Sequence, residues 1–76
     1  MSFQFPRIDM VETGKNIERL RKEKNLTVKQ IQEIFGFESP QAIYKWQWGD
    51  SLPTIDNLLV LAYLFGVSLS SILVIN

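Results

Sequence analysis

The residue types that most often perform catalysis or bind metals are nearly missing from this chain. None of its 76 residues is a cysteine or a histidine. A zinc site of the usual composition, a Ser-His-Asp triad and a cysteine nucleophile are therefore excluded. Two carboxylate pairs, Glu33 with Glu38 and Asp50 with Asp56, are the remaining candidates for acid–base chemistry. So small a domain has little room for a catalytic cleft. We therefore expect no enzyme, no metal, no cofactor and no small-molecule ligand.

Three polar side chains between residues 41 and 45 have a different chemistry. Gln41 and Lys45 are four residues apart, so in a helix they share one face, and Tyr44 lies beside them. A Gln side chain can pair with adenine, and Lys can donate to O6 and N7 of guanine. The Tyr hydroxyl can donate to a phosphate or the ring can rest on a sugar. The alternative is that Gln41 and Lys45 are solvated polar residues and Tyr44 a partly buried aromatic at the edge of the fold.

The charges of the chain balance but are unevenly distributed. Eight residues are Lys or Arg and eight are Asp or Glu, so the net charge does not favour nucleic-acid binding. Most of the cations nevertheless lie within residues 15–29, against Glu18 and Glu23, and none follows Lys45. They are Lys15, Arg19, Arg21, Lys22, Lys24 and Lys29. Such a run is commonly a solvated helix face and can equally be half of a binding surface.

The composition is that of one small globular domain. Hydrophobic residues make up 46% of the chain and charged residues 21%. The first ten residues contain no apolar run of the kind found in signal peptides. The uncharged stretch 57–76 is interrupted by Gly66 and several serines, whereas a membrane span needs about 20 apolar residues. We expect a soluble, cytoplasmic protein without a membrane partner.

The N-terminal residues differ from the rest in their hydrophobic pattern. Residues 1–12 have no helical period, and we expect an arm packed on a domain formed by residues 13–76. Apolar spacing predicts a first helix over Gly14–Lys24, with Thr13 as its N-cap. Asn25 suits the left-handed residue that ends a helix.

Two further helices follow after short connections. Thr27 and Gln30 fit a capping box, which predicts that the second helix starts there and ends at Gly36. Ser39-Pro40 predicts the start of a third helix, with Ser39 as N-cap and Pro40 in the first turn. Gly49 ends this helix.

The last two helices complete an all-α, five-helix fold. Thr54 is expected to cap the fourth, strongly apolar helix, which ends at Gly66, and Ser68 to cap a short fifth helix. The second and third helices, joined by a short turn, are a candidate helix-turn-helix. In the third helix, Ile43 and Trp46 face inward. Its outward residues are Gln41, Tyr44, Lys45 and Trp48.

The order and spacing of these elements match a known pattern. The matching segments are residues 16–21, Leu26-Thr27, Gly36, Ile43, Trp46, residues 49–53, residues 57–62 and residues 65–69. Over about residues 13–74 the chain resembles the XRE/Cro-like helix-turn-helix family, the compact five-helix fold of the lambdoid phage repressors. The resemblance implies sequence-specific binding to double-stranded DNA, usually as a dimer and usually in transcriptional control.

The chain departs from the family pattern at several positions. The interval from Gly36 to Gly49 is one residue longer, which predicts an atypical turn. Gln32 replaces a small residue where the third helix packs closely, and Val28 replaces a Gln that contacts phosphate. Gln47 replaces the Glu that pairs with Arg in the family, and we expect its oxygen still to accept a hydrogen bond from Arg21.

The resemblance also implies roles for individual residues. Bases would be contacted by Gln41, Lys45 and Tyr44, and phosphates by Lys29, Ser39, Thr27 and Trp48. As the alternative to phosphate contact, Lys29 is simply an exposed lysine and Ser39 only caps the helix. For Trp48 we favour packing over the base of the loop that follows, with contact to the DNA backbone or to a protein as the alternative.

Two functions are consistent with the sequence. The first is a small, repressor-like transcriptional regulator that acts by occupying its DNA site. With few basic residues per chain, a homodimer would roughly double the phosphate contacts. The apolar tail of residues 73–75 is either buried in the domain or part of a dimer interface. The second function is a protein-interaction module on the same fold, of the antitoxin or anti-regulator type. The zero net charge, Val28 and Trp48 favour it.

Overall fold

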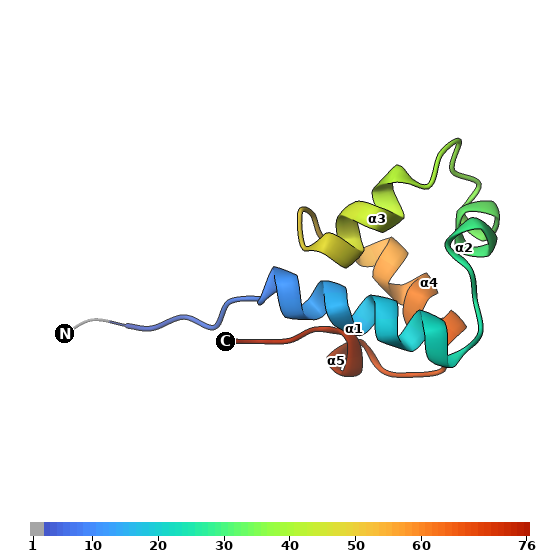
Figure 1. Ribbon diagram of the computed structural model, residues 1–76. Coiled ribbons are helices and arrows are strands. Elements are labelled where there is room, and N and C mark those ends of the chain that lie inside the picture. The colour runs from blue at the N-terminus through green and yellow to red at the C-terminus, as the bar shows by residue number, and fades with distance from the viewer. Residues whose placement is uncertain (1–2) are drawn as a thin grey trace.

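Residues 3–76 are described by a computed structural model as five helices joined by short connections (Figure 1). The helices are α1 (Met10–Glu23), α2 (Val28–Phe35), α3 (Gln41–Trp48), α4 (Ile55–Phe65) and α5 (Leu69–Ile72). Within these residues the β pairing is limited to one isolated antiparallel bridge between Ile8 and Ile75. The all-α, five-helix fold predicted from the sequence is therefore confirmed.

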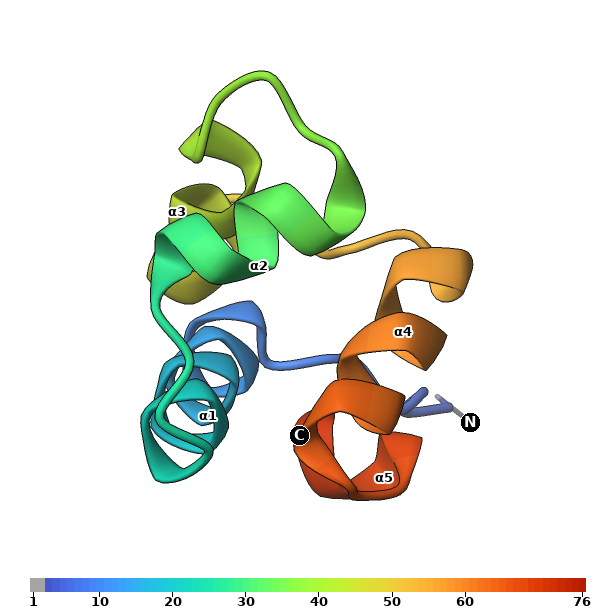
Figure 2. The same cartoon turned by 90° about the vertical axis from the view of Figure 1, so that its right-hand side faces the viewer.

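The helices surround a single apolar core. α1 packs against α3 and α5, α2 packs against α3, and α4 packs against α5 (Figure 2). Every helix supplies at least one fully or almost fully buried side chain. The buried apolar residues are Ile17, Leu20, Ile31, Ile43, Trp46, Leu58, Leu61, Ala62, Phe65 and Ile72. Burial of this shared surface holds α2 and α3 on the rest of the domain.

α1 begins earlier than the sequence indicated. Asp9, not Thr13, is its N-cap, because the Asp9 carboxylate accepts a hydrogen bond of 3.0 Å from the Glu12 N–H. Asp is at least as good an N-cap as Thr, and the extra turn places Thr13 on the buried side of the helix. Residues 10–12, which the sequence assigned to the arm, lie in this extra turn.

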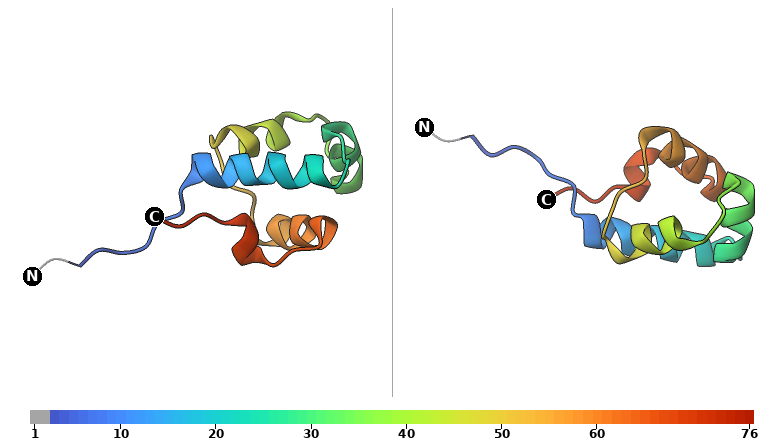
Figure 3. Two further views of the ribbon diagram at one scale, coloured as in Figure 1. Left: turned by 60° about the horizontal axis from the view of Figure 1, so that its bottom comes forward. Right: turned by 90° about the horizontal axis from the view of Figure 1, so that it is seen from above.

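The arm also differs from expectation. Residues 3–7 are exposed and project away from the helices, so the prediction that this segment packs on the domain is wrong (Figure 1; Figure 3). Residues 1 and 2 lie outside the described residues. The base of the arm is anchored, since the Asp9 N–H donates to the Val74 carbonyl at 2.7 Å and the Asn76 N–H donates to the Arg7 carbonyl at 2.8 Å.

The C-terminal tail is the other half of this anchor. Leu73 and Val74 are half-buried, as expected if the tail packs in its own domain, whereas Ile75 is exposed. The Thr13 hydroxyl, completely buried, accepts a hydrogen bond of 2.9 Å from the Val74 N–H. The tail is therefore held on α1 by the Thr13 side chain, which the sequence predicted to be the N-cap of the first helix.

Replacing Thr13 by valine tests this fastening. The substitution keeps the shape of the side chain but leaves the Val74 N–H without its acceptor, and we expect a loss of about 1–2 kcal/mol in the free energy of unfolding. Urea denaturation measures it. Thr13→Ser keeps the hydroxyl and loses only a buried methyl group, at about 1 kcal/mol. A valine variant as stable as the native chain would show that the hydrogen bond does not stabilise the fold.

The ends of α2 and α4 agree with the sequence. The Gln30 N–H donates to the Thr27 hydroxyl at 3.0 Å, and the Thr27 N–H donates to the Gln30 side chain at 2.8 Å, which completes the capping box. The Thr54 hydroxyl accepts from the Asn57 N–H at 3.3 Å. Asn25, which follows α1, has a φ of 56°, the left-handed conformation predicted for it.

Two predicted serine caps are not formed. Pro40, not Ser39, occupies the N-cap position of α3, and its carbonyl accepts from the Tyr44 N–H. The fixed φ of proline brings Pro40 close to helical geometry, so the helix begins directly after it. Ser68 does hold the N-cap position of α5, but its hydroxyl contacts the hydroxyls of Ser70 and Ser71 rather than a backbone N–H.

Candidate nucleic-acid interface

Two glycines let the backbones of α1 and α3 touch. A Cβ atom on Gly14 would lie 2.5 Å from the Gln47 carbonyl oxygen, and one on Gly49 would lie 2.7 Å from the Val11 Cα atom. Both distances are shorter than atoms tolerate, and Gly49 also has a φ of 80°. The first turns of α1 therefore set the position of the C-terminal half of α3. The sequence analysis treated Gly14 only as the first residue of a helix and missed this role.

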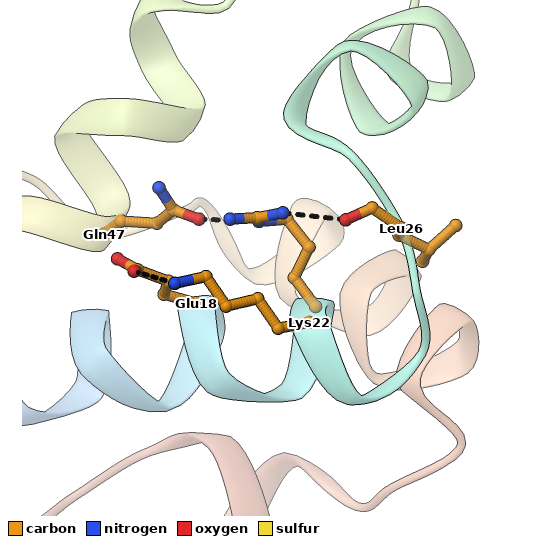
Figure 4. A network of polar contacts seen from close by, with 5 residues as sticks. Glu18, Lys22, Leu26 and Gln47 are labelled. Atoms are coloured by element: carbon orange, nitrogen blue, oxygen red, sulfur yellow. Dashed lines mark hydrogen bonds and ion pairs between the residues drawn. The ribbon is translucent and has the colours of Figure 1, made fainter.

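Arg21 fastens α3 to α1 by hydrogen bonds. Its Nε atom donates to Oε1 of Gln47 at 2.9 Å, and its Nη1 atom donates to the Leu26 carbonyl at 2.8 Å (Figure 4). One side chain thus links α1, the connection to α2, and α3. The expectation that Gln47 accepts a hydrogen bond from Arg21 in place of the glutamate typical of the family is confirmed.

Gln47→Ala is expected to cost about 2 kcal/mol in the free energy of unfolding. The substitution removes the acceptor of a charged donor at a side chain that is only 7% exposed. Thermal or urea denaturation measures the loss. Gln47→Glu keeps an oxygen in place for Arg21 and serves as the control. A stability of the alanine variant equal to that of the native chain would contradict the role given to this bond.

An aromatic cluster holds the turn between α2 and α3. Phe35 stacks on Phe37 with ring centroids 5.1 Å apart, and the Trp46 ring lies edge-on to both, at 5.7 Å and 5.9 Å. The Gln32 side chain donates to the Phe37 carbonyl at 3.2 Å. The longer turn is thereby closed by side chains from both helices. The sequence marked the turn as atypical but did not indicate which contacts hold it.

Comparison with known families identifies the arrangement. The family model described as helix-turn-helix matches residues 17–72, which is most of the chain. The chain belongs to the XRE/Cro-like helix-turn-helix family. This is a family of DNA-binding regulators rather than of enzymes. Comparison with curated protein sequences and with solved structures gives no significant match.

The outer face of α3 is the exposed surface of this helix-turn-helix. Gln41, Tyr44 and Lys45 are exposed, as the spacing predicted, and Trp48 is exposed beside them. Tyr44 and Trp48 stack with ring centroids 5.7 Å apart and planes inclined by 20°. The face therefore has a polar pair beside an aromatic pair. The favoured reading of Trp48 is wrong, because its side chain is 61% exposed instead of covering the following loop.

The residues expected at phosphates come from the start of α2 and from the turn of the helix-turn-helix. Lys29 is exposed in the first turn of α2. The Thr27 hydroxyl accepts from the Gln30 N–H and can still donate its own proton. The Gln41 N–H donates to the Ser39 hydroxyl at a long distance of 3.5 Å. Thr27 and Lys29 belong to the N-cap and first turn of α2, which lies beside α3, and Ser39 lies in the turn just before α3 (Figure 2).

Most exposed cations of α1 already have partners. Lys15, Arg19 and Lys22 each form an ion pair with a carboxylate three or four residues away. The partners are Glu12, Glu23 and Glu18, at 3.1, 2.9 and 2.8 Å. The hydrogen bond and the charge of Lys22 hold the pKa of Glu18 below its usual value (Figure 4). This part of the basic run is thus a solvated, internally neutralised helix face.

Lys29 and Lys45 differ from these cations. Neither forms an ion pair with any of residues 3–76.

Over residues 3–76 no three His, Cys, Asp or Glu side chains gather as metal ligands. None of the helices described has the length and apolar character needed to cross a membrane.

Proposed function

We propose that the chain is a small transcriptional regulator, repressor-like in acting by site occupancy, that binds double-stranded DNA sequence-specifically in the cytoplasm. The observation that carries the proposal is the exposed polar face of α3 on a helix whose position is set by backbone contact, by Arg21 and by the aromatic cluster. A rigidly held recognition helix suits base readout, because small displacements would misplace its hydrogen bonds.

In this proposal α3 lies in the major groove. Gln41 and Lys45 hydrogen-bond to base edges, Gln41 to adenine and Lys45 to guanine. Tyr44 rests beside them against a base or a sugar, and its ring is held by the stack with Trp48. Residues nearer the N-terminus of a recognition helix usually reach the bases, so Trp48, at the end of α3, is assigned to the backbone, where its indole N–H can donate to a phosphate.

Lys29, Thr27 and Ser39 would bind phosphates on the flank of the groove. Exposed backbone N–H groups at the start of α2 favour an anion there, and Lys29 in the same turn adds a charge. These contacts set position and affinity rather than sequence preference. We propose that two chains bind as a homodimer on adjacent half-sites about 34 Å apart, because one electrically neutral chain makes few phosphate contacts.

Selection from a random-sequence duplex library, at low and at moderate salt, tests the function. We expect enrichment of an inverted repeat with half-sites about one helical turn apart. A variant with both Gln41→Ala and Lys45→Ala, folded as judged by circular dichroism, should enrich no sequence. Absence of enrichment by the native chain at both salt concentrations would overturn the proposal.

One observation favours a second candidate, a protein-interaction module of the antitoxin or anti-regulator type. Trp48 is 61% exposed on α3, and Trp is a common anchor of protein interfaces. Salt dependence separates the two functions. DNA binding weakens steeply and linearly in the logarithm of salt concentration, whereas a contact centred on an aromatic pair changes little.

A further inference from the structure

α4 has an apolar stripe that the rest of the described chain leaves uncovered. Ile55, Leu59 and Tyr63 are 68%, 53% and 85% exposed. They are spaced four residues apart and therefore lie in one line along the helix. α4 contains no Lys or Arg, and its single charged residue, Asp56, lies at its start. Such a stripe on a small domain marks a place where another apolar surface binds.

The N-terminal arm has apolar side chains of its own without a partner. Phe3 and Phe5 are 75% and 77% exposed. The hydrogen bonds of Arg7 and Asp9 to the C-terminal tail fix the direction in which the arm leaves the domain. The arm projects away from all five helices, so it does not cover the stripe of its own chain (Figure 1; Figure 3).

The spacing between apolar side chains on the arm matches the spacing between those of the α4 stripe. In an extended segment alternate side chains lie on the same side, about 6.7 Å apart. Residues four apart on a helix are separated by about 6 Å along its axis. An arm that runs against the direction of α4 therefore places Phe5 near Leu59, Phe3 near Tyr63 and Arg7 near the start of the helix.

Charge fixes this orientation. Arg7, on the same side of the arm as both phenylalanines, then meets Asp56. Neither residue forms an ion pair within residues 3–76. The reverse orientation would place Arg7 at the uncharged end of the stripe and leave Asp56 without a cation.

We propose that the arm of one chain binds the α4 stripe of a second chain, and that the second arm binds the first chain in return. The three aromatic side chains of each half, Phe3, Phe5 and Tyr63, bring on the order of 150–250 Å² each when buried. A reciprocal exchange buries six of them, on the order of 900–1,500 Å², and Ile55 and Leu59 add to this area, which reaches the roughly 1,200–2,000 Å² of stable interfaces. The proposal specifies the contact of the homodimer proposed above and is tested without DNA, so the two can fail separately.

Sedimentation equilibrium from micromolar to millimolar protein measures the dimer. Phe3→Ser with Phe5→Ser, and separately Leu59→Ser with Tyr63→Ser, should each raise the dimer dissociation constant about tenfold or more. All four side chains are exposed, so the thermal midpoint of the monomer should not change. Ile34→Ser, which alters an apolar residue on α2 about as exposed as Leu59, is the matched control and should dimerise as the native chain does.

Disulfide crosslinking between introduced cysteines shows which surfaces meet. Because the chain has no native cysteine, only the introduced pair can form a disulfide. Mixing a Phe3→Cys chain with a Tyr63→Cys chain should yield the mixed disulfide in excess over either homodimer. A native chain that stays monomeric at all concentrations would overturn the proposal. So would a dimer that survives loss of both phenylalanines, since the arm would then not hold it, or a Tyr63→Cys chain that crosslinks chiefly to itself, since α4 would then pair with α4.

Discussion

Gly14→Ala is expected to lower the free energy of unfolding by about 3 kcal/mol or more. Two effects oppose each other at this position. Alanine is the better helix former and by itself would stabilise α1 by about 1 kcal/mol. Its Cβ atom, however, would lie 2.5 Å from the Gln47 carbonyl oxygen, and the obstacle is backbone that cannot rotate away. The clash therefore outweighs the gain in propensity, and α1 and α3 must separate.

Chemical denaturation monitored by circular dichroism measures this loss. Gly36→Ala is the informative comparison, because a Cβ atom there meets nothing within 4 Å although φ is 72°. Gly36→Ala should lower the free energy of unfolding by only about 1 kcal/mol, because alanine is strained in the left-handed conformation. If Gly14→Ala proved as stable as Gly36→Ala or more so, the close contact between the two helices would be refuted.

Alanine at Gln41 or at Lys45 is expected to weaken binding to the selected DNA site by about 1–3 kcal/mol each. Each change should also relax the preference for the base that the side chain contacts, because the discrimination comes from hydrogen bonds to that base edge. Binding to a set of duplexes with single base changes measures both effects. Both side chains are exposed, so the fold should not be affected.

Two lysines provide controls for this experiment. Lys29→Ala should weaken binding to all duplexes alike and reduce the salt slope by about one, as loss of a phosphate contact does. Lys15→Ala, on the internally neutralised face of α1, should change neither affinity nor preference. A Lys45→Ala variant that behaves like Lys29→Ala would move Lys45 from the bases to the backbone.

Predictions from the sequence succeeded where local chemistry decides the structure. The capping box of Thr27 and Gln30 and the left-handed Asn25 depend on residues close together in the chain, and all form as predicted. The hydrogen bond between Arg21 and Gln47 was also expected, although 26 positions separate the residues, because the family resemblance supplied that pairing.

The error at Thr13 occurred because distant segments compete for the same residue. Thr13 is a good N-cap by composition, but the tail after α5 uses its hydroxyl, and Asp9 caps α1 instead. Trp48 was expected to pack over the loop that follows α3, whereas it is exposed. Its stack with Tyr44 covers one of its faces and leaves the other free. The use of Thr13 by the tail cannot be read from spacing along the chain, whereas Tyr44 and Trp48, four residues apart, share one face of α3.

The candidate site was predictable in part. The spacing of Gln41 and Lys45 was sufficient to place them on one exposed face of a helix. How firmly that helix is held depends on Gly14 and on the trio of Phe35, Phe37 and Trp46, and these contacts appear only when α1, α2 and α3 are packed together. Which bases and phosphates the exposed residues contact is still a prediction.

The fastening of the tail to α1 has a consequence for how the protein is made. Asn16 donates to the Ile72 carbonyl, Thr13 accepts from the Val74 N–H, and the Asp9 N–H donates to the Val74 carbonyl, so α1 is completed by residues that are synthesised more than 50 positions later. A nascent chain still inside the ribosome beyond α4 has α1 and α3 but lacks these bonds and the buried Ile72. Packing around α1 should therefore be completed only when residues 72–74 have emerged from the ribosome.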